Sequence, residues 1–290
     1  MKTLFGPAGT AESFKTLGYK KTIQVPEYLS RFGLTAFEYQ CGHGVRVGEN
    51  SAKELSLAFQ ENHITPSLHA PYFISMSSVE EEKRLNSVKY ILESARAVKA
   101  MGGKRVVFHS GSCGKISREE ALLKATDTMK LMIQALDEND LGDIILCPET
   151  MGKVNQLGTL SEVLALAKVD KRIIPCIDFG HLNAREGGII KTKKDYENIL
   201  DQMELSLNDH RCVNFHSHFS KIQYTKGGEK CHLTFEDEIF GPEFEPLMEL
   251  IYTRNLSPTI ICESAGTQTE DAFTMKKYSE SLEKGGEIHK

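Results

Sequence analysis

Eight short apolar segments rich in valine, isoleucine and leucine constrain the fold more than any other feature of the chain. They cover residues 3–6, 34–40, 64–70, 104–110, 143–150, 172–178, 212–218 and 258–264. Segments of helical periodicity separate them, such as residues 79–101, where apolar side chains recur every three or four positions before Gly102 and Gly103. This alternation is typical of a parallel sheet covered by helices, and eight repeats over 290 residues predict a TIM barrel.

Further helices are expected over residues 117–136, 192–207 and 243–254. The first of these begins "SREE", which predicts a capping box between Ser117 and Glu120. No low-complexity stretch and no linker rich in proline or serine divides the sequence. We therefore expect a single TIM-barrel domain over residues 1–290.

Composition excludes several classes of protein. The sequence has no run of about 18 apolar residues, and the apolar part of "MKTLFGPAGT" is too short for a signal peptide, so a cytoplasmic protein without a membrane partner is expected. Seven cysteines without a CxxC pair predict reduced thiols in the core. A net charge of -5 argues against non-specific binding of nucleic acid, but leaves a local basic face open. Nothing in the sequence indicates a stable protein partner.

Polar residues occupy the ends of nearly all the predicted strands. They are Glu38, His69, His109, Glu149, Asp178, His216 and Glu263, whereas the first strand ends at Gly6. In a TIM barrel the carboxyl ends of the strands converge on one rim, so these side chains become neighbours. So many imidazoles and carboxylates packed together without a cation would be unfavourable. The pattern therefore predicts a metal site.

The donor set indicates the number and the kind of ions. The six strand ends after Glu38 supply three histidines and three carboxylates, which exceed the needs of one tetrahedral ion, so two or three cations are expected. Glu149, in the middle of the strand order, can bridge two of them. Mixed nitrogen and oxygen donors without thiolate favour Zn²⁺, with Mn²⁺ or Fe²⁺ as alternatives, over Ca²⁺ or Mg²⁺.

Six motifs at the strand ends carry a resemblance to a known family. In chain order they are "SLHAPY", "VVFHSGS", "CPETMG", "CIDFGHLNA", "HSHFSK" and "ICES", of which "DFGH" is the most specific and "CES" the least. Together they resemble the endonuclease IV family of apurinic/apyrimidinic endonucleases, which are TIM barrels of the wider xylose-isomerase-like superfamily. The resemblance runs over essentially the whole chain.

The resemblance implies a role for each matching residue. His69 and His109 would hold one zinc ion with Glu149, which would bridge to a second ion. The second ion would also be held by Asp178, His216 and Glu263, and His181 would hold a third.

The family completes the third site with an aspartate and a histidine in the loop after the seventh strand. Here that loop reads "YTKGGEKCHLTF", in which His232 matches but the aspartate position falls near Glu229 or Lys230. A charged lysine cannot bind a metal ion, whereas Glu229 could reach one. The third site is therefore rebuilt with Glu229, weakened or lost.

Two further polar residues remain open at this stage. His218 lies two positions after His216, so both side chains point to the same face of a strand. The resemblance favours His216 as the ligand and leaves His218 to support it or to contact a DNA phosphate. Glu38 matches no ligand, and either supports the metal site or forms a salt bridge inside the barrel.

The activity that the resemblance implies is zinc-dependent hydrolysis of a phosphodiester at abasic sites in DNA, with Glu149 and Glu263 as catalytic residues. Tyr72 and Phe73 match the aromatic residues that the family inserts into the duplex, and Lys221 is a further candidate for DNA binding. In contrast, the loop after the second strand reads "QCGHGVRVGEN", which is a departure from the basic loop of the family.

Two other functions compete with this one. A sugar isomerase or epimerase of the same superfamily would use one or two cations at Glu149, Asp178, His216 and Glu263, and would not need His69 or His109 as ligands. The second competing function is not enzymatic: the barrel would hold metal only as a binding or regulatory module. About three zinc ions per chain would favour the nuclease, and one or two Mn²⁺ or Mg²⁺ ions the isomerase.

Overall fold

The computed structural model of the chain describes residues 2–287, so Met1 and Lys290, the limits of the predicted domain, lie outside the described residues. Eight parallel strands form the barrel: β1 (Leu4–Pro7), β2 (Ala36–Gln40), β3 (Thr65–His69), β4 (Arg105–Phe108), β5 (Ile145–Pro148), β6 (Cys176–Asp178), β7 (His216–Phe219) and β10 (Thr259–Cys262). They pair as two four-stranded sheets, in the orders β1-β10-β7-β6 and β2-β3-β4-β5. Parallel bridges from Ala8 to Glu38 and from Glu149 to Cys176 join the sheets into a closed ring. The predicted TIM barrel is confirmed.

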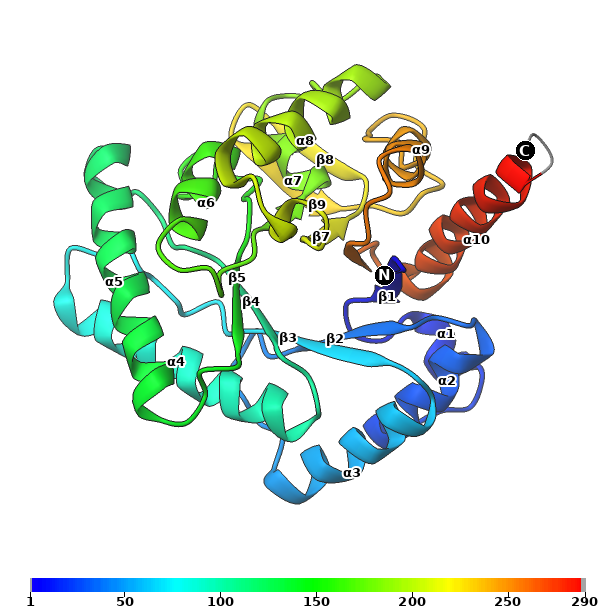
Figure 1. Cartoon of the computed structure of the whole chain (residues 1–290), viewed down its shortest axis with the longest axis horizontal. Helices are drawn as coiled ribbons and strands as arrows, with labels where there is room; N and C mark the ends of the chain where they lie inside the picture. The colour runs from blue at the N-terminus through cyan, green and yellow to red at the C-terminus, as the bar shows by residue number, and fades with distance from the viewer. Residues whose placement is uncertain (1, 288–290) are drawn as a thin grey trace.

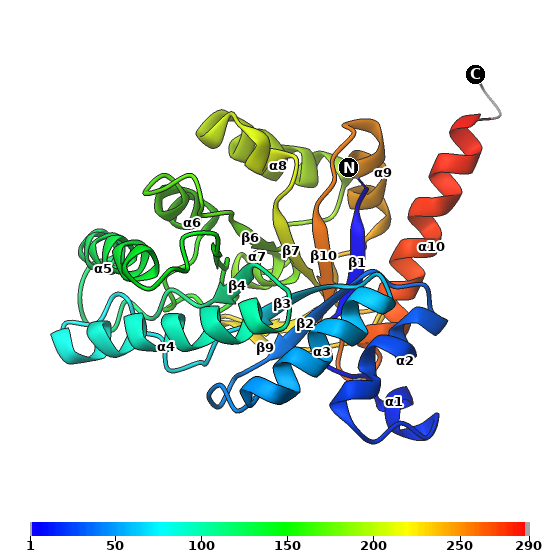
Figure 2. The ribbon, with the colours of Figure 1, turned by 60° about the horizontal axis from the view of Figure 1, so that its bottom comes forward.

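The helices surround this ring of strands (Figures 1 and 2). They are α1 (Glu12–Thr16), α2 (Val25–Arg31), α3 (Glu49–Glu61), α4 (Glu81–Ala100), α5 (Arg118–Glu138), α6 (Leu160–Ala167), α7 (Phe179–Arg185), α8 (Lys193–Leu207), α9 (Glu245–Thr253) and α10 (Gln268–Glu287). Ser117 caps α5, because its hydroxyl accepts a hydrogen bond from the Glu120 amide at 3.1 Å, which is one half of the predicted capping box. Within residues 2–287, no helix combines the length and the apolar character needed to cross a membrane.

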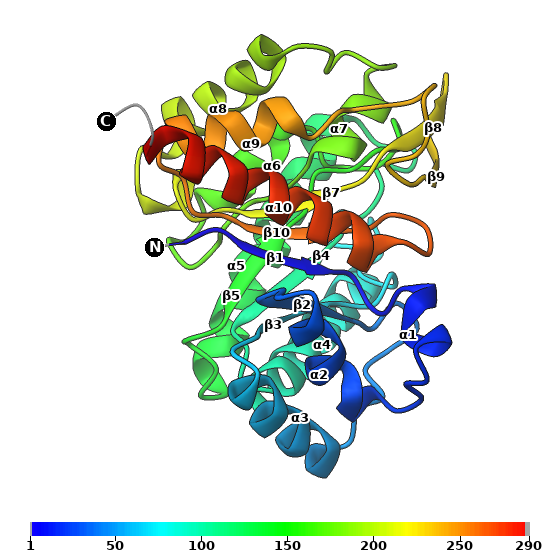
Figure 3. The same cartoon turned by 90° about the vertical axis from the view of Figure 1, so that its right-hand side faces the viewer.

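A β-hairpin that the sequence did not predict follows β7. Its strands, β8 (Ile222–Thr225) and β9 (Gly228–His232), are antiparallel, and Figure 3 shows them on the side of the barrel opposite the N-terminus. Backbone hydrogen bonds fasten β9 to the loop after β5, from the Glu229 amide to the Gly152 carbonyl at 3.0 Å and from the Val154 amide to the Gly227 carbonyl at 3.2 Å. Gly228 is required at this junction, because a Cβ there would lie 2.1 Å from the Gly152 carbonyl oxygen.

The register of β7 decides which side chains reach the rim. Cys176 of β6 pairs with His216, and Asp178, the last residue of β6, pairs with His218. His218 therefore lies level with the carboxyl end of β6, and His216 lies one layer deeper. Five of the seven cysteines are buried, Cys212 is partly buried and Cys231 is exposed.

Candidate metal centre

Three groups of potential metal ligands meet at the carboxyl-terminal rim. The groups are His69, His109 and Glu149; Glu149, Asp178, His218 and Glu263; and His181, Glu229 and His232. Within each group the candidate ligand atoms lie within 4.8 Å of one another. The rim encloses a pocket of about 410 Å³, which most of these residues line together with Tyr72, Met151, Lys153 and Gln156.

Glu149 lies at the centre of the three groups, directly after β5. Its Oε2 is 3.2 Å from Nε2 of His69 and 3.3 Å from Nε2 of His109. Its Oε1 is 3.0 Å from Nδ1 of His181 and 3.2 Å from Nδ1 of His218. Oε2 therefore faces His69 and His109 of the first group and Oε1 faces His218 of the second, which is the arrangement that a bridging ligand needs. The His181 Nδ1 reaches Oε1 as a hydrogen-bond donor.

The electrostatics of the rim suit cations. Burial raises the pKa of Glu149, but the charge of His218 and hydrogen bonds from His109 and His181 outweigh it and hold that pKa well below its usual range. Burial raises the pKa of Asp178 to about 6. Oδ2 of Asp178 is buried and makes no regular hydrogen bond among the described residues, although it lies 3.2 Å from Nδ1 of His181. A buried carboxylate oxygen without a regular hydrogen bond, in a mixed nitrogen and oxygen donor set, fits a divalent ion.

Local hydrogen bonds fix the orientation of the histidine rings. Nδ1 of His69 donates to the Ala70 carbonyl at 2.9 Å, which leaves Nε2 as the ligand atom. Nδ1 of His181 donates to the Thr150 carbonyl at 3.0 Å, and Nδ1 of His232 lies 2.8 Å from the Ser220 hydroxyl. The rings are thus held before any ion binds.

The third group joins α7 to the unpredicted hairpin. Asp178 caps α7 by accepting a hydrogen bond from the His181 amide at 2.7 Å, which places the His181 ring one turn beyond the end of β6. Nε2 of His181 lies 3.4 Å from Oε2 of Glu229, and Nε2 of His232 lies 4.0 Å from Oε1 of the same residue. Glu229 therefore occupies the position for which the sequence left two alternatives, while Lys230 is exposed.

Gly152 leaves room for the side chains of this third group. Replacing it with alanine tests whether the group holds a metal ion. A Cβ at Gly152 would lie 2.6 Å from Cβ of Glu229 and 2.9 Å from Cδ2 of His181, so one of them must move. We expect Gly152→Ala to lose one ion per chain while the other ions remain, measured by elemental analysis of the purified protein. Gly227→Ala is the matched control, because its nearest neighbour would be 3.7 Å away. An unchanged ion count in Gly152→Ala would exclude a metal ion at this group.

The register corrects the predicted role of His216. The second group contains His218, whereas His216 lies deeper, with its Nε2 3.0 Å from Oε2 of Glu38. Burial lowers the pKa of His216 to about 4, so its ring is neutral. Burial also raises the pKa of Glu38, but His218 and His216 outweigh it and hold that pKa well below its usual range. His216 therefore contacts a buried carboxylate instead of the rim.

Two of the predicted DNA contacts are also wrong. His218 has no exposed surface and Lys221 is 5% exposed. Nζ of Lys221 donates to the Asp237 carbonyl at 2.7 Å and pairs with Glu243 at 2.8 Å, so it fastens the loop after the hairpin. Neither side chain can meet a DNA phosphate.

The two aromatic residues after β3 do reach solvent. Tyr72 and Phe73 are 56% and 54% exposed. The Tyr72 ring stacks on His109 with 5.5 Å between the ring centroids, and so forms a wall of the pocket. Gly42, in the loop after β2, lies under this ring, since a Cβ there would be 2.4 Å from it. The glycine-rich loop thus makes room for Tyr72.

Comparison with known proteins identifies the family of the chain. Residues 26–284 match the model of a family described as xylose isomerase-like TIM barrel. The chain belongs to this family. An uncharacterized protein of Methanocaldococcus jannaschii is 31% identical over 277 residues, which cover 96% of this chain and 97% of the relative.

Other similar proteins carry functional names. The "Probable endonuclease 4" of Malacoplasma penetrans is 30% identical over 121 residues, which are 40% of each chain. The crystal structure of endonuclease IV from Thermus thermophilus matches with a TM-score of 0.67 and 18% identity, over 97% of this chain and all of the other. A D-tagatose 3-epimerase-like protein matches with a TM-score of 0.70 and 19% identity, over 91% and 94%. The resemblance to endonuclease IV is confirmed, and both solved structures share the fold.

Proposed function

We propose that this chain is a metal-dependent phosphodiester hydrolase that incises DNA at abasic sites, in the manner of endonuclease IV. The observation that carries the proposal is the shared carboxylate of Glu149, with His69 and His109 at one oxygen and His218 at the other, so that Glu149 belongs to two groups of ligands. A site for a single ion does not require this arrangement. We propose Zn²⁺ as the cofactor, two or three ions per chain, with Mn²⁺ or Fe²⁺ as alternatives.

Divalent ions held by these residues would supply a nucleophilic water at neutral pH and would neutralise phosphate charge. The chain itself would orient the substrate. Lys153 lines the pocket and adds a positive charge where a phosphate would enter. Glu263, whose Oε2 lies 3.4 Å from Nδ1 of His218, provides a second carboxylate that faces the pocket. We assign Glu149 and Glu263 to the reacting end of the site.

The exposed aromatic pair supports DNA as the substrate. Tyr72 lines the pocket and Phe73 follows it with an exposed ring, so both can stack against bases next to a displaced nucleotide. Displacing an abasic nucleotide from the duplex costs less than displacing an intact one, because there is no base to unstack.

An epimerase is the second candidate, and one observation favours it. Glu149, Asp178, His218 and Glu263 form a complete group that could hold a single ion against a hydroxy-ketone. This reaction has no need of the His69–His109 pair or of the third group. Both are present at the same pocket, and they favour hydrolysis.

An incision assay tests the proposal. We expect metal-replete protein to cut a duplex that contains one tetrahydrofuran abasic analogue, leaving a 3'-hydroxyl and a 5'-deoxyribose phosphate analogue. A chelator should abolish the cutting and added Zn²⁺ should restore it, whereas an undamaged duplex of the same sequence should stay intact. Absence of incision at every salt concentration tried would refute the nuclease. Epimerisation of a keto-sugar by the same preparation would then favour the second candidate.

A further inference from the structure

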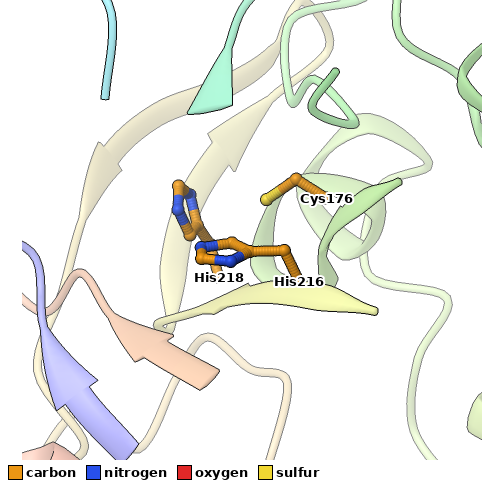
Figure 4. A group of neighbouring side chains, drawn as sticks. All are labelled: Cys176, His216 and His218. Carbon is orange, nitrogen blue, oxygen red and sulfur yellow. The ribbon is translucent and has the colours of Figure 1, made fainter. Parts of the chain in front are cut away.

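A chain of buried polar side chains runs beneath the rim, through Arg105 of β4, His216 of β7, Glu38 of β2 and His218 of β7. Glu38, His216 and His218 have no exposed surface. Figure 4 shows the two imidazole rings projecting from β7 toward the same side, with the thiol of Cys176 facing them. Buried polar residues are costly unless each hydrogen-bonding atom is satisfied, so the direction of every bond matters here.

Arg105 fixes the direction of the hydrogen bonds along this chain of side chains. Its Nη1 lies 3.4 Å from Nδ1 of His216, and a guanidinium can only donate. Nδ1 of His216 therefore accepts, and the proton of this neutral ring is on Nε2. That Nε2 donates to Oε2 of Glu38 at 3.0 Å. Because Nδ1 of His216 accepts from Arg105, its Nε2 is free to donate to the buried carboxylate.

Glu38 collects further donors. Ser67 donates its hydroxyl to Oε2 at 3.0 Å, and Gln40 donates its side-chain amide to Oε1 at 3.3 Å. Nε2 of His218 lies 2.9 Å from Oε1, although its ring is not aligned for a regular hydrogen bond. A carboxylate surrounded by donors is held in its charged form. The side of Oε1 that does not accept from Gln40 faces Nε2 of His218.

We infer that Glu38 is a positioning residue for His218, held by Arg105 and His216, and that it keeps the His218 proton on Nε2 so that Nδ1 is the metal ligand. This inference rests on the proposed metal centre. Nδ1 of His218 hydrogen-bonds Oε1 of Glu149 at 3.2 Å and lies 3.4 Å from Oε2 of Glu263. It is therefore the nitrogen that faces the second group, where a bound ion would replace a proton on it. A carboxylate that accepts the other N–H of a ligating histidine fixes the ring and raises its basicity.

The same side chains suggest one other arrangement, a buried ion held by Cys176, His216 and His218. Two observations disfavour it. Nε2 of His216 carries a proton, because its Nδ1 accepts from Arg105. The guanidinium already places a positive charge beside the group, and it balances the charge of Glu38.

Zinc affinity and the proton position on His218 test the inference. In the zinc-loaded wild-type chain, long-range ¹H–¹⁵N correlation spectra should place the His218 proton on Nε2. Glu38→Gln, which keeps the size of the side chain but removes its charge, should lower zinc affinity about 10–100-fold. Glu162→Gln is the matched control. Glu162 is also a buried carboxylate, but it pairs with Arg118 at 2.7 Å, away from Glu38 and the metal ligands. The zinc affinity of this variant should be unchanged.

The outcomes separate the inference from the proposed function. A His218 proton on Nδ1 in zinc-loaded wild type would overturn it, and this measurement does not depend on the folding of a variant. Unchanged zinc affinity in a folded Glu38→Gln variant would also overturn the inference about Glu38. If that variant still incised abasic DNA, the proposed function would stand. Zinc binding that depends on Glu38 but comes without incision would support the inference and refute the nuclease. An additional ion that Cys176→Ser removes would place a metal in the buried group instead, and a wild-type chain that binds no zinc would refute both proposals.

Discussion

Replacing Glu149 with alanine is expected to abolish incision of abasic DNA and most metal binding. Its two oxygens face histidines of separate groups, so its loss removes a ligand from two groups at once. Metal ions typically contribute several kcal/mol to the stabilisation of a transition state, and about 1.4 kcal/mol corresponds to a factor of ten. The rate should therefore fall at least about 1,000-fold, and the ion content to one per chain or fewer.

Steady-state incision rates and elemental analysis of the same preparation check this prediction. Glu186→Ala is a suitable control, because Glu186 directly follows α7 but its side chain is about half exposed and belongs to none of the three groups. Glu149→Ala protein with wild-type activity and a full complement of ions would show that the carboxylate does not bridge.

Alanine at His218 and alanine at His216 should affect different properties: the first should lower the ion content and the rate, and the second the free energy of unfolding. Both residues lie on β7 and neither has exposed surface, but only His218 belongs to the rim groups that include Asp178 and Glu263. His218→Ala should lose one ion and about 100- to 10,000-fold in rate, from the several kcal/mol that a metal contributes. His216→Ala should keep the ion count when zinc is saturating, and should lose about 1.5–3 kcal/mol of the free energy of unfolding, the usual value of a hydrogen bond to a charged group.

Elemental analysis and urea unfolding of the two variants measure these effects. The pair is well matched in burial and strand position, so a general loss of packing would affect both alike. If His216→Ala instead lost the ion and His218→Ala kept it, the assignment from the resemblance would be right and the assignment from the register wrong.

The barrel and most of its rim could be predicted from the sequence because both depend on local patterns. Apolar runs separated by amphipathic segments specify strands and helices, and a TIM barrel brings the carboxyl ends of its strands together. Polar residues at those ends, such as His69, His109 and Glu149, therefore meet at one pocket without further information.

The choice between His216 and His218 could not be made in this way. Residues two apart on a strand share a face, so both fit the alternation, and only the pairing of β7 with β6 determines which one reaches the level of Asp178. Lys221 illustrates a second limit. Its position in a rim loop suggested exposure, but its partners Asp237 and Glu243 come from a loop whose path the sequence does not specify.

The hairpin that carries Glu229 and His232 differs from the rest of the rim in how it is attached. The ligands of the other two groups stand on or next to strands of the barrel, whereas this pair depends on backbone hydrogen bonds to the loop after β5. Main-chain attachment places little demand on side chains except at Gly228, where a Cβ would collide with the Gly152 carbonyl oxygen. Substitutions elsewhere in the hairpin should therefore change the affinity of the third group for its ion while the strands of the barrel keep their positions.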